Sequence, residues 1–261
     1  MSNNNAVLVT RPKQQATEFV ELLAAEGIKS LEFPCMEIQQ VELSEALKHT
    51  LKTLNDNNLI IFISVNAVEK AAELMHQLAI KPKSITAKIA TIGKATYTAA
   101  ITLGFKVNLS PESGFNSDAL LALEELQEAN IQGAQCLIFR GLGGLEHLAD
   151  ELSVRGAKPH YAEVYQRKKP RQDEGISRQE LSNNWNGLQI KILTVTSNES
   201  LQNLYDMLKQ PGKDAMLKTM LIVASQRGFE LAQRLGFKSI VLAQSALNQH
   251  MLEAVKSNWN K

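Results

Sequence analysis

Residues 6–33 begin with the apolar run Ala6-Val7-Leu8-Val9, pass through the amphipathic stretch from Lys13 to Glu26, and reach a second short run at Ser30-Leu31-Glu32-Phe33. The middle stretch has apolar residues at helical spacing, which predicts one buried helix face formed by Phe19, Leu22 and Leu23. Gly27 follows directly and suits the left-handed position at which many helices end. These segments predict a strand–helix–strand unit.

The same pattern returns in the second half of the chain. Residues 6–29 align with residues 135–158 without a gap, and the match includes Arg11 with Arg140 and Gly27 with Gly156. A later alignment pairs residues 89–106 with 221–238, and both segments end in Leu-Gly-Phe-Lys. Both alignments are displaced by about half of the 261-residue chain, which predicts a tandem repeat of one α/β unit.

Several predicted strands are apolar throughout, such as Leu59-Ile60-Ile61-Phe62-Ile63. Strands of this kind are typical of parallel sheets that carry helices on both faces. The polar stretch at residues 168–175 is the best candidate for a linker, and residues 34–37 form a second candidate joint. The sequence therefore predicts an α/β protein with more than one part.

The composition excludes several classes of protein. The 28 Lys and Arg residues balance 27 Asp and Glu residues, so no overall field attracts nucleic acid or an anionic membrane, and an anion site must be local. Two cysteines, Cys35 and Cys136, cannot build a disulfide framework or a four-ligand metal site, and we expect core thiols in a reducing compartment. No apolar segment of about 20 residues is present, so we expect a soluble, cytoplasmic protein.

Six predicted turns between a strand and the next helix are the places to look for a ligand site. In parallel sheets, ligands bind beyond the carboxyl ends of the strands. Each turn offers hydroxyls, glycines or cations beside the start of a helix, where backbone N–H groups and the helix dipole favour anions. We therefore predict a face that binds several anionic groups, formed by Thr10-Arg11-Pro12, Ser64-Val65-Asn66, Gly93-Lys94-Ala95-Thr96, Arg140-Gly141-Leu142-Gly143-Gly144, Thr196-Ser197-Asn198 and Ser225-Gln226-Arg227-Gly228.

Simpler roles remain open for these residues. A hydroxyl at the start of a helix can do no more than cap it, at about 1 kcal/mol, and this alternative applies to Ser64, Thr96, Ser197 and Ser225. An arginine at the end of a buried strand must meet a carboxylate, a carbonyl or a ligand. Arg11 and Arg140 could therefore each form a structural ion pair or contact a ligand.

Other chemistries lack their motifs. Gly141-x-Gly143 resembles part of a dinucleotide fingerprint, with Glu163 as its acidic residue, but Glu146 replaces the third glycine, and its charge would oppose a pyrophosphate. A nicotinamide oxidoreductase is therefore a distant alternative. The five histidines are scattered without metal-ligand spacing, so no metal site is predicted among His49, His76, His147, His160 and His250. The lack of these motifs does not exclude an enzyme that works mainly by positioning its substrate.

Six segments, in order along nearly the whole chain, resemble the uroporphyrinogen-III synthase family. They are Val7-Leu8-Val9-Thr10-Arg11-Pro12, Phe62-Ile63-Ser64-Val65-Asn66-Ala67-Val68, Ile92-Gly93-x-x-Thr96, Phe139-Arg140-Gly141-Leu142-Gly143-Gly144-Leu145-Glu146, Val164-Tyr165-Gln166-Arg167 and Val195-Thr196-Ser197. The resemblance implies two similar α/β lobes, each a parallel sheet flanked by helices, joined by a two-stranded β-ladder. Mapped onto this chain, residues 1–35 and 168–261 form one discontinuous lobe, 38–165 form the inserted lobe, and the linkers lie near 34–38 and 164–169.

The resemblance also implies an activity. The family closes the linear tetrapyrrole hydroxymethylbilane to uroporphyrinogen III, with loss of water and inversion of the last ring, ring D, without a metal or an organic cofactor. Hydroxymethylbilane is then the substrate, handed over transiently from hydroxymethylbilane synthase, and neither nucleic acid nor a membrane is a partner. The alternative from another class is a cytosolic two-lobed protein that binds an anionic metabolite and regulates a partner. The oligomeric state is left open.

Roles for single residues follow from the same resemblance. Tyr165 matches the tyrosine proposed to assist departure of the substrate hydroxyl as a weak acid, although a tyrosine that only packs at the hinge is the alternative. Leu142 and Leu145 depart from the polar and cationic residues of relatives, and Ser225-Gln226-Arg227 replaces a different turn found in some relatives. The expected substrate-binding residues are Arg11, Ser64, Lys94, Thr96, Arg140, Gly141, Gly143, Gly144, Thr196, Ser197, Ser225 and Arg227.

Overall fold

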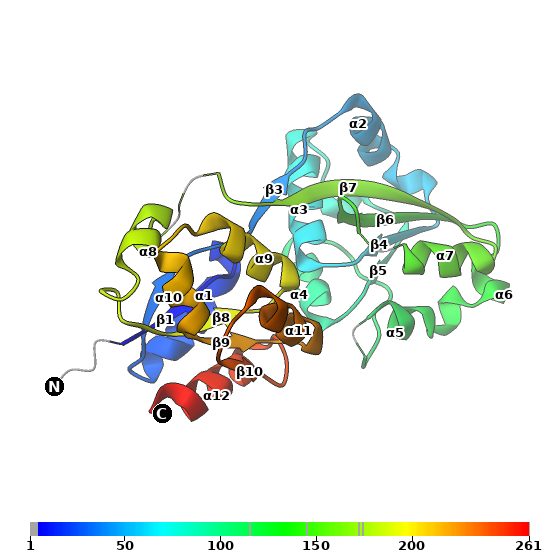
Figure 1. The fold of residues 1–261 in the computed structure, drawn as a ribbon. Coiled ribbons are helices and arrows are strands. Elements are labelled where there is room, and N and C mark those ends of the chain that lie inside the picture. The colour runs from blue at the N-terminus through cyan, green and yellow to red at the C-terminus, as the bar shows by residue number, and fades with distance from the viewer. Residues whose placement is uncertain (1–4, 115, 145, 172, 174, 261) are drawn as a thin grey trace. The chain divides into compact units, whose positions relative to one another are not determined.

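The chain divides into two compact units, one formed by Met1–Glu37 with Lys168–Lys261 and the other by Ile38–Arg167 (Figure 1). This computed structural model describes residues 5–114, 116–144, 146–171, 173 and 175–260. Each unit has its own five-stranded sheet with helices on both faces. The predicted α/β fold class is confirmed.

The first unit contains a parallel sheet in the order β10-β9-β8-β1-β2. Its strands are β1 (Ala6–Val9), β2 (Lys29–Glu32), β8 (Ile190–Val195), β9 (Met220–Val223) and β10 (Ile240–Leu242). Its helices are α1 (Lys13–Ala25), α8 (Arg178–Asn184), α9 (Asn198–Met207), α10 (Gly212–Lys218), α11 (Gln226–Leu235) and α12 (Asn248–Trp259). Because side chains alternate along a strand, Leu8 packs beneath α9 while its neighbours Val7 and Val9 pack beneath α1 and α12.

The second unit contains a sheet in the order β3-β7-β6-β4-β5. Its strands are β3 (Glu37–Gln40), β4 (Leu59–Phe62), β5 (Lys88–Thr91), β6 (Gln135–Gly141) and β7 (Lys158–Lys168). Its helices are α2 (Glu45–Lys52), α3 (Val65–Gln77), α4 (Lys94–Thr102), α5 (Ser117–Leu121), α6 (Glu128–Ile131) and α7 (His147–Val154), with 3-10 turns at Leu54–Asp56, Pro82–Ser84 and Glu124–Leu126. Phe62 and Phe139 stack on one face of this sheet, with ring centroids 4.9 Å apart, in the core covered by α3.

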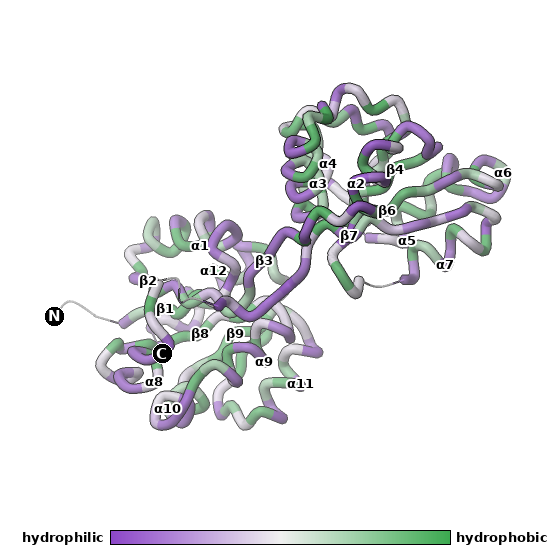
Figure 2. The backbone as a smooth tube through the Cα atoms, turned by 90° about the horizontal axis from the view of Figure 1, so that it is seen from above, coloured by the Kyte–Doolittle hydropathy of each residue, from purple (hydrophilic) through white to green (hydrophobic). Residues whose placement is uncertain are grey.

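Strand β3 runs antiparallel to β7, whereas β4, β5, β6 and β7 pair in parallel. The Val41 amide donates to the Val164 carbonyl, and Gln166 donates to the side chain of Gln39, so the numbers fall on one strand as they rise on the other. Figure 2 shows that β3 and the end of β7 are mostly hydrophilic. The resemblance implies β3 and β7 as a linker ladder, and both strands also belong to the sheet of the second unit. Tyr165 lies within β7.

The matched sequence segments occupy matching places in the two sheets. Strand β6 corresponds in sequence to β1, β7 to β2, β4 to β8 and β5 to β9, and the sheet orders β5-β4-β6-β7 and β9-β8-β1-β2 agree. Gly27 and Gly156, which match in the first alignment, and Gly236, which matches Gly104 in the second, each follow a helix and have φ values of 69°, 79° and 95°. The predicted helix stops are therefore confirmed, and the duplication itself stays a prediction.

Candidate active site

A pocket of about 320 Å³ opens in the second unit at the carboxyl ends of its parallel strands. Residues that follow β4 and β5, the ends of β6 and β7, and the starts of α5 and α7 form its wall. The lining residues are Ile63, Ile92, Ser117, Ile138, Arg140, Gly141, Leu142, Gly144, His147, Leu148, Tyr161, Tyr165 and Arg167. Four residues expected at a site from the sequence thus lie together: Arg140, Gly141, Gly144 and Tyr165.

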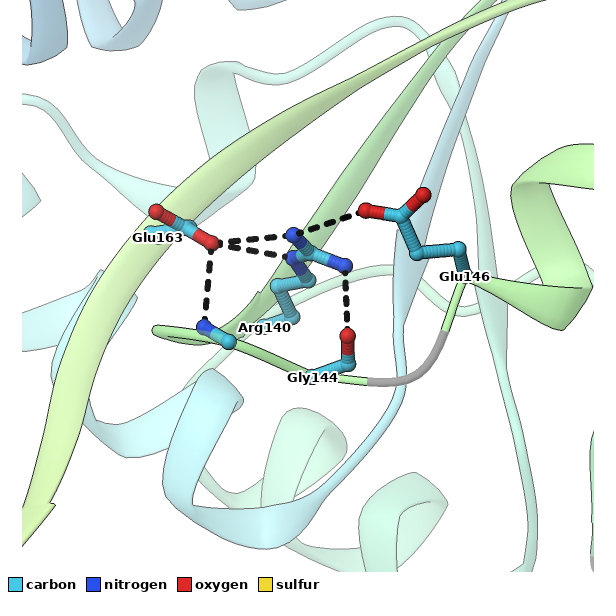
Figure 3. Close-up of polar contacts among 5 residues, drawn as sticks. Arg140, Gly144, Glu146 and Glu163 are labelled. Carbon is cyan, nitrogen blue, oxygen red and sulfur yellow. Dashed lines mark hydrogen bonds and ion pairs between the residues drawn. The ribbon is translucent and has the colours of Figure 1, made fainter.

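Arg140 is 6% exposed, and its side chain is held by protein groups on every nitrogen (Figure 3). Its Nε and Nη2 donate to Glu163 Oε1 over 3.2 and 3.0 Å, and Nη1 donates to the Gly144 carbonyl over 3.1 Å. The guanidinium carbon lies 3.4 Å from the centroid of the Tyr161 ring, a cation–π arrangement. Of the two roles left open for Arg140, the structure shows the ion pair.

The glycine turn after β6 is closed by its own hydrogen bonds. The N–H groups of Leu142, Gly143 and Gly144 donate to the Tyr165 carbonyl, to Glu163 Oε1 and to the Gly141 carbonyl. Gly143 and Gly144 are among the residues expected to bind substrate, and in this structure their N–H groups shape the turn. Leu142 is 60% exposed at the pocket wall, whereas Leu145 lies outside the described residues.

Tyr165 is 3% exposed, and its hydroxyl lies 3.3 Å from Ser64 Oγ. Arg140 pairs with Glu163 in the β6–β7 register, but the next residue, Gly141, pairs with Tyr165, so Val164 is an extra residue on β7. This is a β-bulge, a feature that re-aims side chains and is frequent beside active sites. A Cβ atom at Gly141 would lie 2.6 Å from Tyr165 Cε2, so only glycine leaves room for the ring.

Ser64 has two roles in the structure. Its Oγ accepts from the Ala67 amide over 3.1 Å and so caps α3, as the simpler alternative predicts. The same oxygen is the partner of the Tyr165 hydroxyl, and either group can be the donor. The phenol is therefore held by a residue that is itself fixed at the start of a helix.

The turn after β5 differs from its predicted arrangement. Gly93, not Thr96, occupies the N-cap position of α4, and Thr96 is 5% exposed in the first turn of that helix. The capping interpretation of Thr96 is therefore wrong. Lys94 is exposed on the same turn, and neither residue lines the pocket, which is reached from this turn by Ile92.

The remaining expected residues belong to the first unit, where the turns after β1, β8 and β9 share one edge of a parallel sheet. Ser197 and Ser225 each accept from a backbone amide over 3.1 Å and cap α9 and α11, which confirms their capping role. Thr196 is half-buried beside the first of these caps, and Arg227 is exposed beside the second.

Arg11 also has protein partners. Its guanidinium donates to Asn248 Oδ1 and, over 2.8 Å, to the Ala246 carbonyl, and it lies 5.1 Å from the centroid of the Phe19 ring. Burial lowers the pKa of Arg11 from its ordinary value, and the charge of Glu18 opposes this shift in part. The structure thus shows a structural role, through a carbonyl and an amide rather than an ion pair.

Several pocket residues were missed by the sequence analysis. Tyr161 lines the pocket and is not among the residues expected from the sequence, His147 is named there only as a histidine without metal-ligand spacing, and Arg167 only as part of a matched segment. Glu163, the partner of Arg140, is named there only as part of a dinucleotide fingerprint. Tyr161 and Glu163 alternate along β7 and therefore share a face, which is the signal that could have placed both beside Arg140. His147 Nε2 lies 2.7 Å from Asp118 Oδ1, and this hydrogen bond raises the pKa of His147.

Neither a metal centre nor a membrane-spanning helix is found among the described residues. They contain no group of three or more His, Cys, Asp or Glu side chains that could hold a metal ion. None of their helices is both long enough and apolar enough to cross a bilayer. Cys35 and Cys136 are buried free thiols, as predicted, and burial raises the pKa of Cys136 to about 11.

Comparisons with known proteins point to one family. The family model described as Uroporphyrinogen-III synthase HemD matches residues 17–253. The uroporphyrinogen-III synthase of Escherichia coli (strain K12) is 33% identical over 252 residues, which cover 96% of this chain and 100% of the relative. Two solved structures share the fold, each with a TM-score of 0.58. Uroporphyrinogen-III synthetase from Helicobacter pylori 26695 is 18% identical, and the match covers 97% of this chain and 98% of that one. A mutant uroporphyrinogen III synthase from Thermus thermophilus is 14% identical, and the match covers 98% of this chain and 99% of that one. This chain belongs to the uroporphyrinogen-III synthase family.

Proposed function

We propose that this chain cyclises hydroxymethylbilane to uroporphyrinogen III, with loss of water and inversion of ring D. The observation that carries the proposal is the pocket lined by Tyr165, whose hydroxyl lies 3.3 Å from Ser64 Oγ, in a chain that belongs to this family over most of its length. Family membership favours this enzyme over a regulatory protein that binds an anionic metabolite, because a relative that matches 96% of this chain over its own full length is named as the synthase.

The chemistry needs little beyond a weak acid and a fixed geometry. The hydroxymethyl group sits on an electron-rich pyrrole, so its C–O bond breaks as the ring nitrogen supplies electrons and an azafulvene forms. We propose that Tyr165 donates its proton to the departing oxygen, which leaves as water, while the Ser64 hydroxyl hydrogen-bonds the resulting phenolate. The substituted carbon of ring D then attacks the azafulvene carbon, and the resulting spiro intermediate fragments and recloses with the ring inverted.

The main task of the protein is to hold the linear substrate so that the substituted carbon reacts, since uncatalysed closure gives the uninverted isomer. The substrate carries eight carboxylates, which require donors spread over a wide surface. We propose that the turns at the carboxyl ends of the strands supply part of these donors. The residues that are exposed or half-buried there, and therefore accessible, include Lys94, Thr196, Ser197, Ser225 and Arg227.

Two features of the cellular setting are also proposals. A reducing compartment such as the cytoplasm fits the two cysteines, which are buried free thiols. Transient hand-over from hydroxymethylbilane synthase fits a substrate that closes without an enzyme, because a short time in free solution limits formation of the wrong isomer.

The test couples purified hydroxymethylbilane synthase to this protein, oxidises the products and separates the type I and type III porphyrin isomers. The proposal expects mostly type III isomer without added metal or nucleotide. Formation of type I alone, as in a control without this protein, would overturn it.

A further inference from the structure

We propose that Arg167, rather than Arg140, is the cation that binds a substrate carboxylate in the pocket of the second unit. This inference rests on the proposed function and assigns a residue to part of its substrate. Among the described residues, the pocket lining includes three basic side chains, Arg140, His147 and Arg167, and no acidic one. A substrate carboxylate will bind to the side chain whose positive charge and N–H donors are not already taken up by protein groups.

In Arg140 both are taken up. Its Nε and Nη2 both donate to Glu163 Oε1, its Nη1 donates to the Gly144 carbonyl, and its flat face lies 3.4 Å from the centroid of the Tyr161 ring. The Glu163 carboxylate offsets its charge at 3.0 Å, and Glu146 adds a second carboxylate at 4.0 Å. A substrate carboxylate would have to displace a buried ion pair to reach this guanidinium, at a cost of several kcal/mol.

His147 is also committed. Its Nε2 lies 2.7 Å from Asp118 Oδ1, so the ring already has a carboxylate partner. A substrate carboxylate beside His147 would also lie near the Asp118 carboxylate. Repulsion from Asp118 would offset most of its attraction to the His147 ring.

Arg167 is different. It is exposed at the pocket wall, and within the described part of the chain no carboxylate or carbonyl partner of its guanidinium is found. It stands two residues beyond Tyr165 on β7, which corresponds to about 7 Å along a strand. A planar guanidinium binds a carboxylate through two parallel hydrogen bonds. The guanidinium of Arg167 is therefore placed to bind an acetate or propionate side chain of the pyrrole whose hydroxymethyl group faces the Tyr165 hydroxyl.

The test compares KM and kcat for hydroxymethylbilane, generated by the coupled synthase, in Arg167→Gln and in Lys158→Gln. Lys158 is an exposed cation at the opposite end of β7, so the second variant makes the same change in net charge away from the pocket. We expect KM to rise about tenfold in Arg167→Gln, the loss of one charged hydrogen-bonded contact, with kcat within about twofold of the wild type. We also expect the increase of KM with salt to become weaker in Arg167→Gln only.

Three outcomes would overturn the assignment. One is a wild-type KM in Arg167→Gln, the second is an equal rise of KM in Lys158→Gln, and the third is a folded Arg140→Met variant whose KM rises as much as that of Arg167→Gln. If Arg140→Met does not fold, the comparison of Arg167→Gln with Lys158→Gln still decides. Failure of the wild-type protein to form the type III isomer would instead overturn the proposed function, so the two failures are distinguishable.

Discussion

Arg140 and Glu163 lie opposite each other on the adjacent parallel strands β6 and β7, and two nitrogens of the guanidinium lie within 3.2 Å of one carboxylate oxygen. That oxygen also accepts from the Gly143 amide over 3.4 Å. A single side chain thus holds both the buried arginine and the glycine turn. Because this turn contacts Tyr165 through Gly141, the ion pair supports the wall of the pocket that we assign to catalysis.

Replacement of Glu163 by Gln should therefore destabilise the protein. The amide keeps the shape of the side chain but leaves the buried Arg140 without its compensating charge, and we expect the free energy of unfolding in urea to fall by about 2 kcal/mol. The matched control is Glu146→Gln, because this carboxylate is 67% exposed and 4.0 Å from the same guanidinium. The control should lose no more than about 0.5 kcal/mol. Equal losses in the two variants would show that the Glu163 pair has no special role.

Gly141→Ala should impair both stability and catalysis. The added methyl group would lie 2.6 Å from the Tyr165 ring, so the ring must shift, at a cost of about 1–3 kcal/mol in the free energy of unfolding. We expect kcat for type III formation to fall about tenfold as the phenol leaves its place beside Ser64.

Gly104→Ala is the control that separates the loss of stability from the loss of kcat expected in Gly141→Ala. Gly104 has a φ of 87° and open space around its Cα, so alanine there introduces backbone strain away from the pocket. This control should lose about 1 kcal/mol of stability and retain the wild-type kcat. An unchanged kcat in a folded Gly141→Ala protein would contradict the placement of Tyr165 in the reaction.

Much of the fold follows from local sequence. The continuous apolar run at residues 59–63 predicts a strand buried on both faces, and β4 is such a strand. Gly27 and Gly236 predict helix ends, and both have the positive φ that disfavours other residues. Residues that follow strands predict a site at the carboxyl edge of a sheet, and the pocket of the second unit lies there. These features depend on interactions among near neighbours in sequence.

The partners of the candidate site residues could not be predicted in the same way. Arg11 contacts Ala246 and Asn248 near the far end of the chain, and nothing in the sequence around Arg11 names them. The pairing of Arg140 with Glu163 depends on the register of β6 and β7, which the sequence pattern does not fix. Thr96 was considered as a helix cap, but the helix starts after Gly93, because glycine also tolerates the N-cap position.

The pair of His147 and Asp118 should respond to pH. The hydrogen bond to Asp118 raises the pKa of His147 above its usual value of 6.5 in the folded protein. The contribution of this pair to stability is therefore fully present below pH 6.5 and is lost as the pH rises through the higher, folded-state pKa.

An NMR titration of the His147 ring checks this shift. Asp118→Asn should bring its pKa back toward the ordinary value, whereas Asp150→Asn, which removes a smaller contribution to the shift, should lower it much less. A His147 pKa that is the same in Asp118→Asn and in the wild type would show that the pair does not form in solution.

The central claim is that the pocket around Tyr165 carries out the cyclisation, and the initial rate of type III formation by Tyr165→Phe tests it most directly. The loss of the phenolic proton donor should lower this rate about ten- to a hundredfold, and activity should remain because the substrate hydroxyl also leaves without assistance. Tyr205→Phe is the matched control, because Tyr205 lies in the first unit with Lys213 over its ring, and it should keep the wild-type rate. A folded Tyr165→Phe protein that forms type III isomer at the wild-type rate would contradict the claim.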